Sequence, residues 1–182
     1  MENIYKLIVS EERLNSRFKL LNHPFFEPAK RIIENICILF NDKDGNFIKD
    51  FQSTGFDARL WEIYLFIFLY ENNFEQIDDV NRPDFHVKKK DYDFFIEASL
   101  SAEKVDEKYS REFINEAVEK NDLKIQEELT NYYSIRLGSV LFSKLNKKYW
   151  ELEWVKDKPL VLAITPSHNY MAKFLPDAKI ME

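Results

Sequence analysis

Apolar residues recur at helical spacing in two N-terminal segments of the chain. Residues 1–22 alternate charged and apolar positions, and this pattern predicts that they are helical. The same period in the next apolar segment predicts a helix over residues 28–40, with Pro28 near its start, where a missing N–H costs little. The polar run over residues 41–46 then predicts a turn or loop.

The third helical segment is apolar on almost every face. It runs from about Asp57, a suitable N-cap residue, to about Asn72. Its centre, Leu60–Tyr70, contains one charged residue, Glu62. A helix that is apolar all round is usually buried. Eleven residues are too few to cross a bilayer, which takes about 20, so we expect a helix of the protein core.

After this helix the period changes to that of strands. A strand is expected near residues 74–80, and residues 83–100 have the pattern of a β-hairpin with a polar turn. The apolar run over residues 159–164 is typical of a buried central strand.

Between the hairpin and that last strand the pattern is helical again. The pattern predicts two charged helices over residues 102–133, broken near Asn121–Asp122, and a further helix over residues 134–150. Helices and strands in this order predict an α/β fold with a mixed sheet. We expect one domain over residues 1–182, with an N-terminal helical part over residues 1–50 and a helical insertion over residues 102–133.

Composition excludes several classes of protein. The net charge is −6, from 26 basic and 32 acidic residues. This excludes a uniformly basic nucleic-acid binder but leaves room for a local basic surface. Three separated glycines cannot form a phosphate-binding loop. The single cysteine, Cys37, excludes an internal disulfide and a cysteine zinc site, and its apolar helical setting predicts a core residue.

The N-terminus has no apolar segment long enough for an export signal. We therefore expect a soluble, cytoplasmic protein without a membrane partner. The three histidines lack metal-binding spacing, and the nucleophile elbow of α/β-hydrolases is absent from the sequence. The final residues show no typical ending, so we also expect that the chain could belong to a longer protein.

Three acidic residues lie where a charge is costly. Glu62 interrupts the apolar helix, Asp84 opens the first hairpin strand, and Glu97 stands between two apolar triplets of the second. An unpaired buried carboxylate costs several kcal/mol, so each needs a cation, a donor or a proton. One divalent ion would satisfy all three, and hard oxygen ligands favour Mg²⁺ or Mn²⁺ over zinc.

A shared ion requires Asp84 and Glu97 to project from the same face of the hairpin. If they oppose each other, Val87 opposes Phe94, and the connecting loop has an even number of residues, either 90–91 or 89–92. Ser99 then lies on the same face as Glu97, at the next position along the site.

These residues carry a resemblance. Pro83-Asp84, twelve intervening residues and then Glu97-Ala98-Ser99, preceded by a helix that bears Glu62, resembles the PD-(D/E)XK superfamily of restriction-endonuclease-like phosphodiesterases. The resemblance implies an αβββαβ core over residues 56–165. It implies that Asp84 and Glu97 ligate Mg²⁺, that Glu62 supports the ion or its water, and that the protein cleaves nucleic acid, in a defence or restriction setting.

The chain departs from the superfamily at the residue two positions after the second acid, which is Ser99 instead of lysine. The superfamily tolerates migration of this lysine, and Lys144 is the predicted substitute. Lys147, Lys148 and Arg136 are expected to attract the phosphates of the nucleic acid, DNA in preference to RNA, with salt-sensitive affinity. Cleavage of both DNA strands would favour a homodimer.

Other interpretations of the same residues stay open. Glu62 could pair with Arg59 one turn earlier, Asp84 could be a turn residue, and Glu97 could face water on an edge strand. The site could be catalytically degenerate, leaving a module that binds nucleic acid or protein without cleaving it. The charged stretch over residues 102–133 could instead belong to a helical interaction protein.

Overall fold

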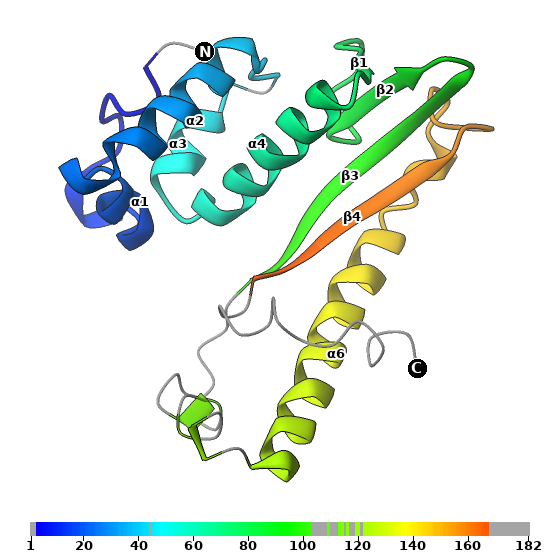
Figure 1. Ribbon diagram of the computed structural model, residues 1–182. Helices are drawn as coiled ribbons and strands as arrows, with labels where there is room; N and C mark the ends of the chain where they lie inside the picture. The colour runs from blue at the N-terminus through cyan, green and yellow to red at the C-terminus, as the bar shows by residue number, and fades with distance from the viewer. Residues whose placement is uncertain are drawn as a thin grey trace. The chain divides into compact units, whose positions relative to one another are not determined.

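The computed structural model describes residues 3–43, 45–102, 109, 113–114, 116, 119–120 and 122–167 (Figure 1). The chain divides into two compact units. The first is formed by Met1–Ser99 and Lys148–Ala163, and the second by Leu100–Lys147 and Ile164–Glu182. Each unit has its own cluster of buried apolar side chains.

Helices form the N-terminal part of the first unit. They are a 3-10 helix at Glu11–Arg13, α1 (Ser16–Leu21), a 3-10 helix at Pro24–Phe26, α2 (Glu27–Leu39), α3 (Phe47–Gln52) and α4 (Phe56–Glu71). The predicted helix over residues 28–40 is confirmed as α2, and Cys37 is buried within it. Burial raises the pKa of the Cys37 thiol to about 12, as expected of a core cysteine that is not a nucleophile.

The prediction of one helix over residues 1–22 is wrong, because only a 3-10 helix and the short α1 form there. The reason is the buried amide of Gln52 in α3. Its Nε2 donates to the carbonyl oxygens of Ile4 (2.9 Å) and Lys6 (2.7 Å), and its Oε1 accepts from the N–H of Ile8 (2.9 Å). These long-range bonds satisfy backbone groups that a helix would have paired internally.

The helix predicted from Asp57 is α4, but its first residue is Phe56 and its N-cap is Gly55. Asp57 is therefore not the cap. Its carboxylate forms an ion pair with Arg17 of α1 at 2.6 Å. The cap is a glycine because the backbone comes close to α3: a Cβ on Gly55 would lie 2.8 Å from Cβ of Asp50 and 3.1 Å from its carbonyl oxygen.

We expect Gly55→Ala to destabilise the protein by about 1–3 kcal/mol, because the backbones of α3 and α4 must separate to admit the methyl group. Urea unfolding measures this loss. Gly138→Ala is the matched control: no atom lies within 4 Å of its added Cβ, and helix propensity favours alanine by up to about 1 kcal/mol. Equal stabilities of the two variants would contradict the close approach at Gly55.

A four-stranded mixed sheet follows α4, so the predicted α/β class is confirmed. Its strands, in the spatial order β1-β2-β3-β4, are β1 (Glu75–Gln76), β2 (Phe85–Lys89), β3 (Tyr92–Ala102) and β4 (Leu160–Ser167). β1, β2 and β3 are antiparallel neighbours, whereas β3 and β4 run in the same direction in Figure 1. The strand expected near residues 74–80 is reduced to the two residues of β1.

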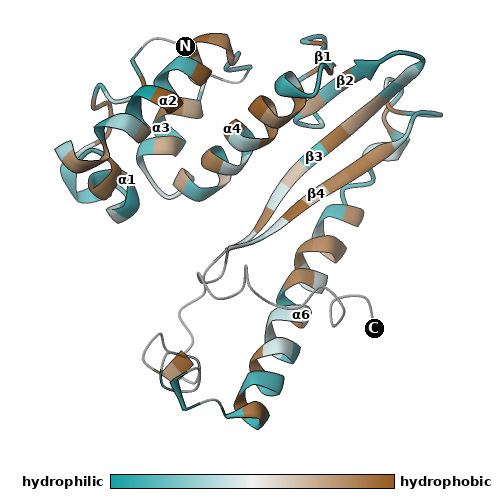
Figure 2. Ribbon diagram, in the orientation of Figure 1, coloured by the Kyte–Doolittle hydropathy of each residue, from teal (hydrophilic) through white to brown (hydrophobic). Residues whose placement is uncertain are grey.

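The hairpin has the register expected if Asp84 opposes Glu97. Val87 pairs with Phe94 and Lys89 with Tyr92, which leaves residues 90–91 as the loop. One face of the hairpin packs against α4. Its apolar cluster comprises Leu65, Phe66, Leu69, Phe85, Val87, Ile96 and Ala98. Figure 2 shows the hydrophobic colour along much of α4, β3 and β4.

The second unit contains α6 (Leu123–Leu145). Asp122 caps this helix by accepting from the N–H groups of Lys124 and Ile125, which places its start at the predicted break. The expected separate helix over residues 134–150 is wrong, because Ser134 continues α6 with its hydroxyl bonded to the carbonyl oxygen of Thr130. Within the described ranges, no helix is both long and apolar enough to cross a membrane.

Candidate functional site

The hairpin brings Asp84 and Glu97 to one face of the sheet. Phe85 pairs with Ile96, so the register extended by one residue sets Asp84 opposite Glu97. Side chains alternate along strands, so both acids belong to the face opposite the one that packs on α4. Directly opposed residues have Cβ atoms about 4.5–5.5 Å apart, which is within reach of a common ligand. Ser99 follows Glu97 on the same face.

Glu97 is buried in the interior of the sheet, with 4% of its surface exposed. It lies on β3, which has β2 on one side and β4 on the other. Glu97 is therefore not an acid that faces water on an edge strand. The hydroxyl of Tyr149 donates to Oε1 of Glu97 at 3.2 Å. Tyr149 was not among the site residues predicted from the sequence. It lies in a 3-10 helix (Tyr149–Glu151) and not at the end of a long helix.

Asp84 is held to the opposite strand by its side chain. The backbone N–H of Ala98 donates to Oδ2 of Asp84 at 2.7 Å. Because Ala98 directly follows Glu97, this bond fixes the Asp84 carboxylate beside the second acid. A short, well-aligned bond to an ionised acceptor is among the stronger hydrogen bonds of a protein.

Glu62 of α4 forms an ion pair with Arg59, which was the alternative interpretation to its role at a metal ion. Its Oε2 lies 2.9 Å from Nη1 of Arg59, and its side chain is 14% exposed. Nη2 of Arg59 reaches Asp50 of α3 at 2.8 Å, and the guanidinium lies over the ring of Phe47. The charge of Glu62 is therefore matched within the protein, in a bridge that joins α3 to α4.

Glu62 and Asp84 both line a cavity of about 410 Å³ in the first unit. Among the described residues, Glu97 does not contribute to this lining, and no three His, Cys, Asp or Glu side chains are grouped so that they could hold a metal ion together. The arrangement that fits a divalent ion is the opposed pair of Asp84 and Glu97. Mg²⁺ is commonly held by one or two carboxylates, with waters and substrate phosphates as its other ligands.

The predicted basic residues divide between the two units. Arg136 and Lys144 lie on α6 and Lys147 follows it, all in the second unit, so the site described in the first unit does not include them. Lys148 belongs to the first unit, immediately before Tyr149. Its ammonium group is exposed and pairs with Glu151 at 3.0 Å.

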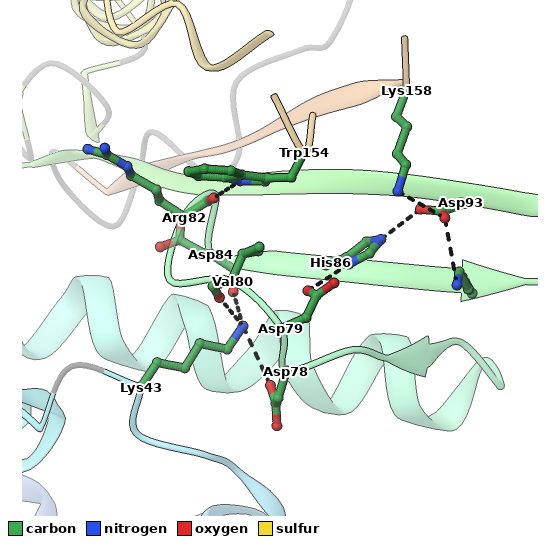
Figure 3. Close-up of polar contacts among 11 residues, drawn as sticks. Lys43, Asp78, Asp79, Val80, Arg82, Asp84, His86, Asp93, Trp154 and Lys158 are labelled. Atoms are coloured by element: carbon green, nitrogen blue, oxygen red, sulfur yellow. Dashed lines mark hydrogen bonds and ion pairs between the residues drawn. The ribbon is translucent and has the colours of Figure 1, made fainter. Parts of the chain in front are cut away.

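A second polar cluster lies on the same sheet face, centred on His86 (Figure 3). Its Nδ1 lies 2.8 Å from Asp79 and its Nε2 lies 2.7 Å from Asp93. Both ring nitrogens can donate to carboxylates only when the imidazole is doubly protonated. The ring is 4% exposed and stacks on Phe95 at 4.2 Å, and the ammonium group of Lys158 lies 3.1 Å from Asp93.

Acid should weaken this cluster through Asp93. Desolvation raises the pKa of Asp93, but hydrogen bonds and charges from His86 and Lys158 outweigh it, and the pKa lies below its ordinary value of 3.8. A carboxyl group with a depressed folded-state pKa stabilises the fold above its unfolded pKa and loses this contribution as the pH falls through the folded value.

We therefore expect Asp93→Asn to be less stable than wild type near neutral pH, and the difference in unfolding free energy to shrink below about pH 4. Urea unfolding over a pH series measures both. The control is Asp91→Asn, which removes an exposed carboxylate from the turn of the same hairpin. A difference for Asp93→Asn that is constant with pH would contradict the assignment.

The chain has an α/β fold with two opposed carboxylates, Asp84 directly before β2 and Glu97 on β3. No protein-family model, no curated protein and no solved structure matches the chain.

Proposed function

We propose that this protein is a Mg²⁺- or Mn²⁺-dependent phosphodiesterase that cleaves nucleic acid, with Asp84 and Glu97 as the metal ligands. The observation that carries the proposal is the register of the hairpin, which sets these two acids opposite each other on one face. A carboxylate buried on the interior of a sheet is costly unless a donor or cation compensates it. The hydroxyl of Tyr149 donates to Glu97, and a bound cation would add to this compensation.

The order of the elements supports the same proposal. From α4 onward the described elements are one helix, three antiparallel strands, a helix and a fourth strand beside β3. Apart from the 3-10 helix before β4, this order supports the αβββαβ core that the resemblance to the PD-(D/E)XK superfamily implies. Asp84 directly precedes the second strand, Glu97 lies on the third, and the partly buried Glu62 lies on the preceding helix.

When bound, a divalent ion would activate a water molecule and neutralise charge on the scissile phosphate. The protein's own contribution is to orient the two carboxylates. The N–H of Ala98 occupies Oδ2 of Asp84, and the hydroxyl of Tyr149 occupies Oε1 of Glu97. Such second contacts hold a ligand in one orientation and raise the affinity of its site.

The remaining roles come from outside the hairpin. That Lys144 replaces the lysine missing at Ser99 stays a prediction from the sequence. Arg136, Lys147 and Lys148 contribute to phosphate binding, which would weaken steeply with salt. Glu62 pairs with Arg59 in the bridge that joins α4 to α3, and its predicted role at the ion stays a prediction.

The test is Mn²⁺-dependent cleavage of plasmid DNA, single-stranded DNA and RNA by the wild-type chain, combined with thermal unfolding in the presence and absence of Mn²⁺. Cleavage together with a rise in Tm supports the proposal. A chain that neither cleaves nor is stabilised by Mn²⁺ or Mg²⁺ overturns it.

A second candidate is a non-catalytic module of the same fold that binds nucleic acid or protein. Two observations favour it: Ser99 stands where the superfamily has its lysine, and each of the three acids already accepts a bond from the protein. This candidate predicts salt-sensitive nucleic-acid binding without cleavage at any Mn²⁺ concentration. The same assays therefore separate the two functions.

A further inference from the structure

Lys43 lies beside Asp84, although 41 residues separate the two in the chain. It belongs to the segment between α2 and α3, for which the sequence predicted only a turn or loop. Its side chain is 19% exposed and lines the same cavity as Asp84. A lysine that is this far buried needs acceptors for its three ammonium hydrogens.

The acceptors all come from the segment that leads into β2. The ammonium nitrogen lies 3.1 Å from the carbonyl oxygen of Val80 and 3.5 Å from that of Asp84. A carboxylate oxygen of Asp78 is also 3.5 Å away. Figure 3 shows Lys43 reaching this segment from one side. One side chain therefore ties together both ends of the loop over residues 80–84.

The same loop is anchored on its other side by Trp154. Its indole N–H donates to the carbonyl oxygen of Arg82 at 2.8 Å (Figure 3). With the bond from Ala98 to the Asp84 carboxylate, three separate parts of the first unit fix this short loop. The contact of Lys43 with the carbonyl oxygen of Asp84, at 3.5 Å, is long, but it acts directly on the backbone of Asp84.

We propose that Lys43 is a positioning residue for Asp84: its ammonium group fixes the backbone at Val80 and Asp84, so that the Asp84 carboxylate is presented opposite Glu97. The consequence for metal affinity rests on the proposed function. The positioning itself does not rest on the proposed function. The hydrogen bond from the N–H of Ala98 to the Asp84 carboxylate measures it in the absence of metal.

The experiment compares the full chain with Lys43→Met and Lys43→Arg. Amide hydrogen exchange of Ala98 should be roughly 10-fold or more faster in Lys43→Met, since loosening the loop lets the Asp84 carboxylate leave the N–H. Calorimetric titration with Mn²⁺ should show affinity lower by roughly 10- to 100-fold, the usual cost of losing an outer-shell partner. Lys43→Arg keeps the charge and the donors and should recover part of both.

Two further variants keep the result interpretable. Asp78→Asn removes the charge that pairs with Lys43 and keeps an amide oxygen that can accept from Asn41, so little change in Ala98 exchange is expected. Lys19→Met removes an exposed lysine of α1 and controls for the loss of one charge. Because the exchange of Ala98 is read in folded protein, a general loss of stability appears as faster exchange of all the amides of β3 and is told apart from a local change.

The outcomes separate the two proposals. Unchanged exchange of Ala98 in Lys43→Met overturns the positioning role, whatever the metal does. Faster exchange of Ala98 without Mn²⁺ binding to the wild-type chain supports the positioning role and overturns the metal site. Both effects together support both proposals.

Discussion

Asp84→Asn and Glu97→Gln are each expected to reduce Mn²⁺-dependent cleavage more than about 100-fold, beyond the cost of losing an outer-shell partner. Each substitution keeps the shape of the side chain and removes its negative charge. The Asn side chain can still accept from the N–H of Ala98, and the Gln side chain can still accept from the hydroxyl of Tyr149. The fold should therefore survive while the attraction for a divalent ion is lost.

The measurements are the initial rate of plasmid cleavage at several Mn²⁺ concentrations and the Mn²⁺-induced rise in Tm. Both should disappear in the two variants. Asp91→Asn is the matched control, because it removes a carboxylate from the exposed turn of the same hairpin and should retain both. If either variant at the opposed pair cleaves at the wild-type rate, the assignment of that residue as a ligand is wrong.

The parts of the fold that the sequence predicted are those with a strong local period. The hairpin is the clearest example: opposing Asp84 to Glu97 required an even loop, and the structure has the two-residue loop. The helices α2 and α4 likewise follow from apolar spacing, to within one or two residues at their ends.

The parts that the sequence did not predict depend on contacts between distant residues. The first ten residues have helical spacing, but the amide of Gln52 holds their backbone in another conformation. The helix α6 runs through Ser134, where a start was expected, and the serine hydroxyl bonds back to the carbonyl oxygen of Thr130 in the preceding turn. Neither effect leaves a periodic signal in the sequence.

The candidate site shows the same division. Acids among apolar neighbours stand out in a sequence, so Glu97 and Asp84 could be found together with their common face. Their partners could not: Tyr149 lies 52 residues after Glu97, and Lys43 lies 41 residues before Asp84. The partner of Glu62 was the exception, since Arg59 is only three positions away on the same helix.

Arg59→Met is expected to destabilise the protein by on the order of 3 kcal/mol, because it leaves the mostly buried Glu62 without its cation and also releases Asp50. Arg31→Met is the matched control. Arg31 pairs with Glu27 one turn away, but its side chain is 73% exposed, and such a pair contributes less than about 1 kcal/mol.

Urea unfolding of the two variants, together with Glu62→Gln and the double variant, measures the coupling between Arg59 and Glu62. If the bridge fixes α4, Glu62→Gln should recover part of the stability lost in Arg59→Met, since no buried charge is then left unmatched. If Arg59→Met instead costs no more than Arg31→Met, Arg59 does not hold Glu62 in solution. The role at a divalent ion that the sequence predicted for Glu62 would then stay a prediction.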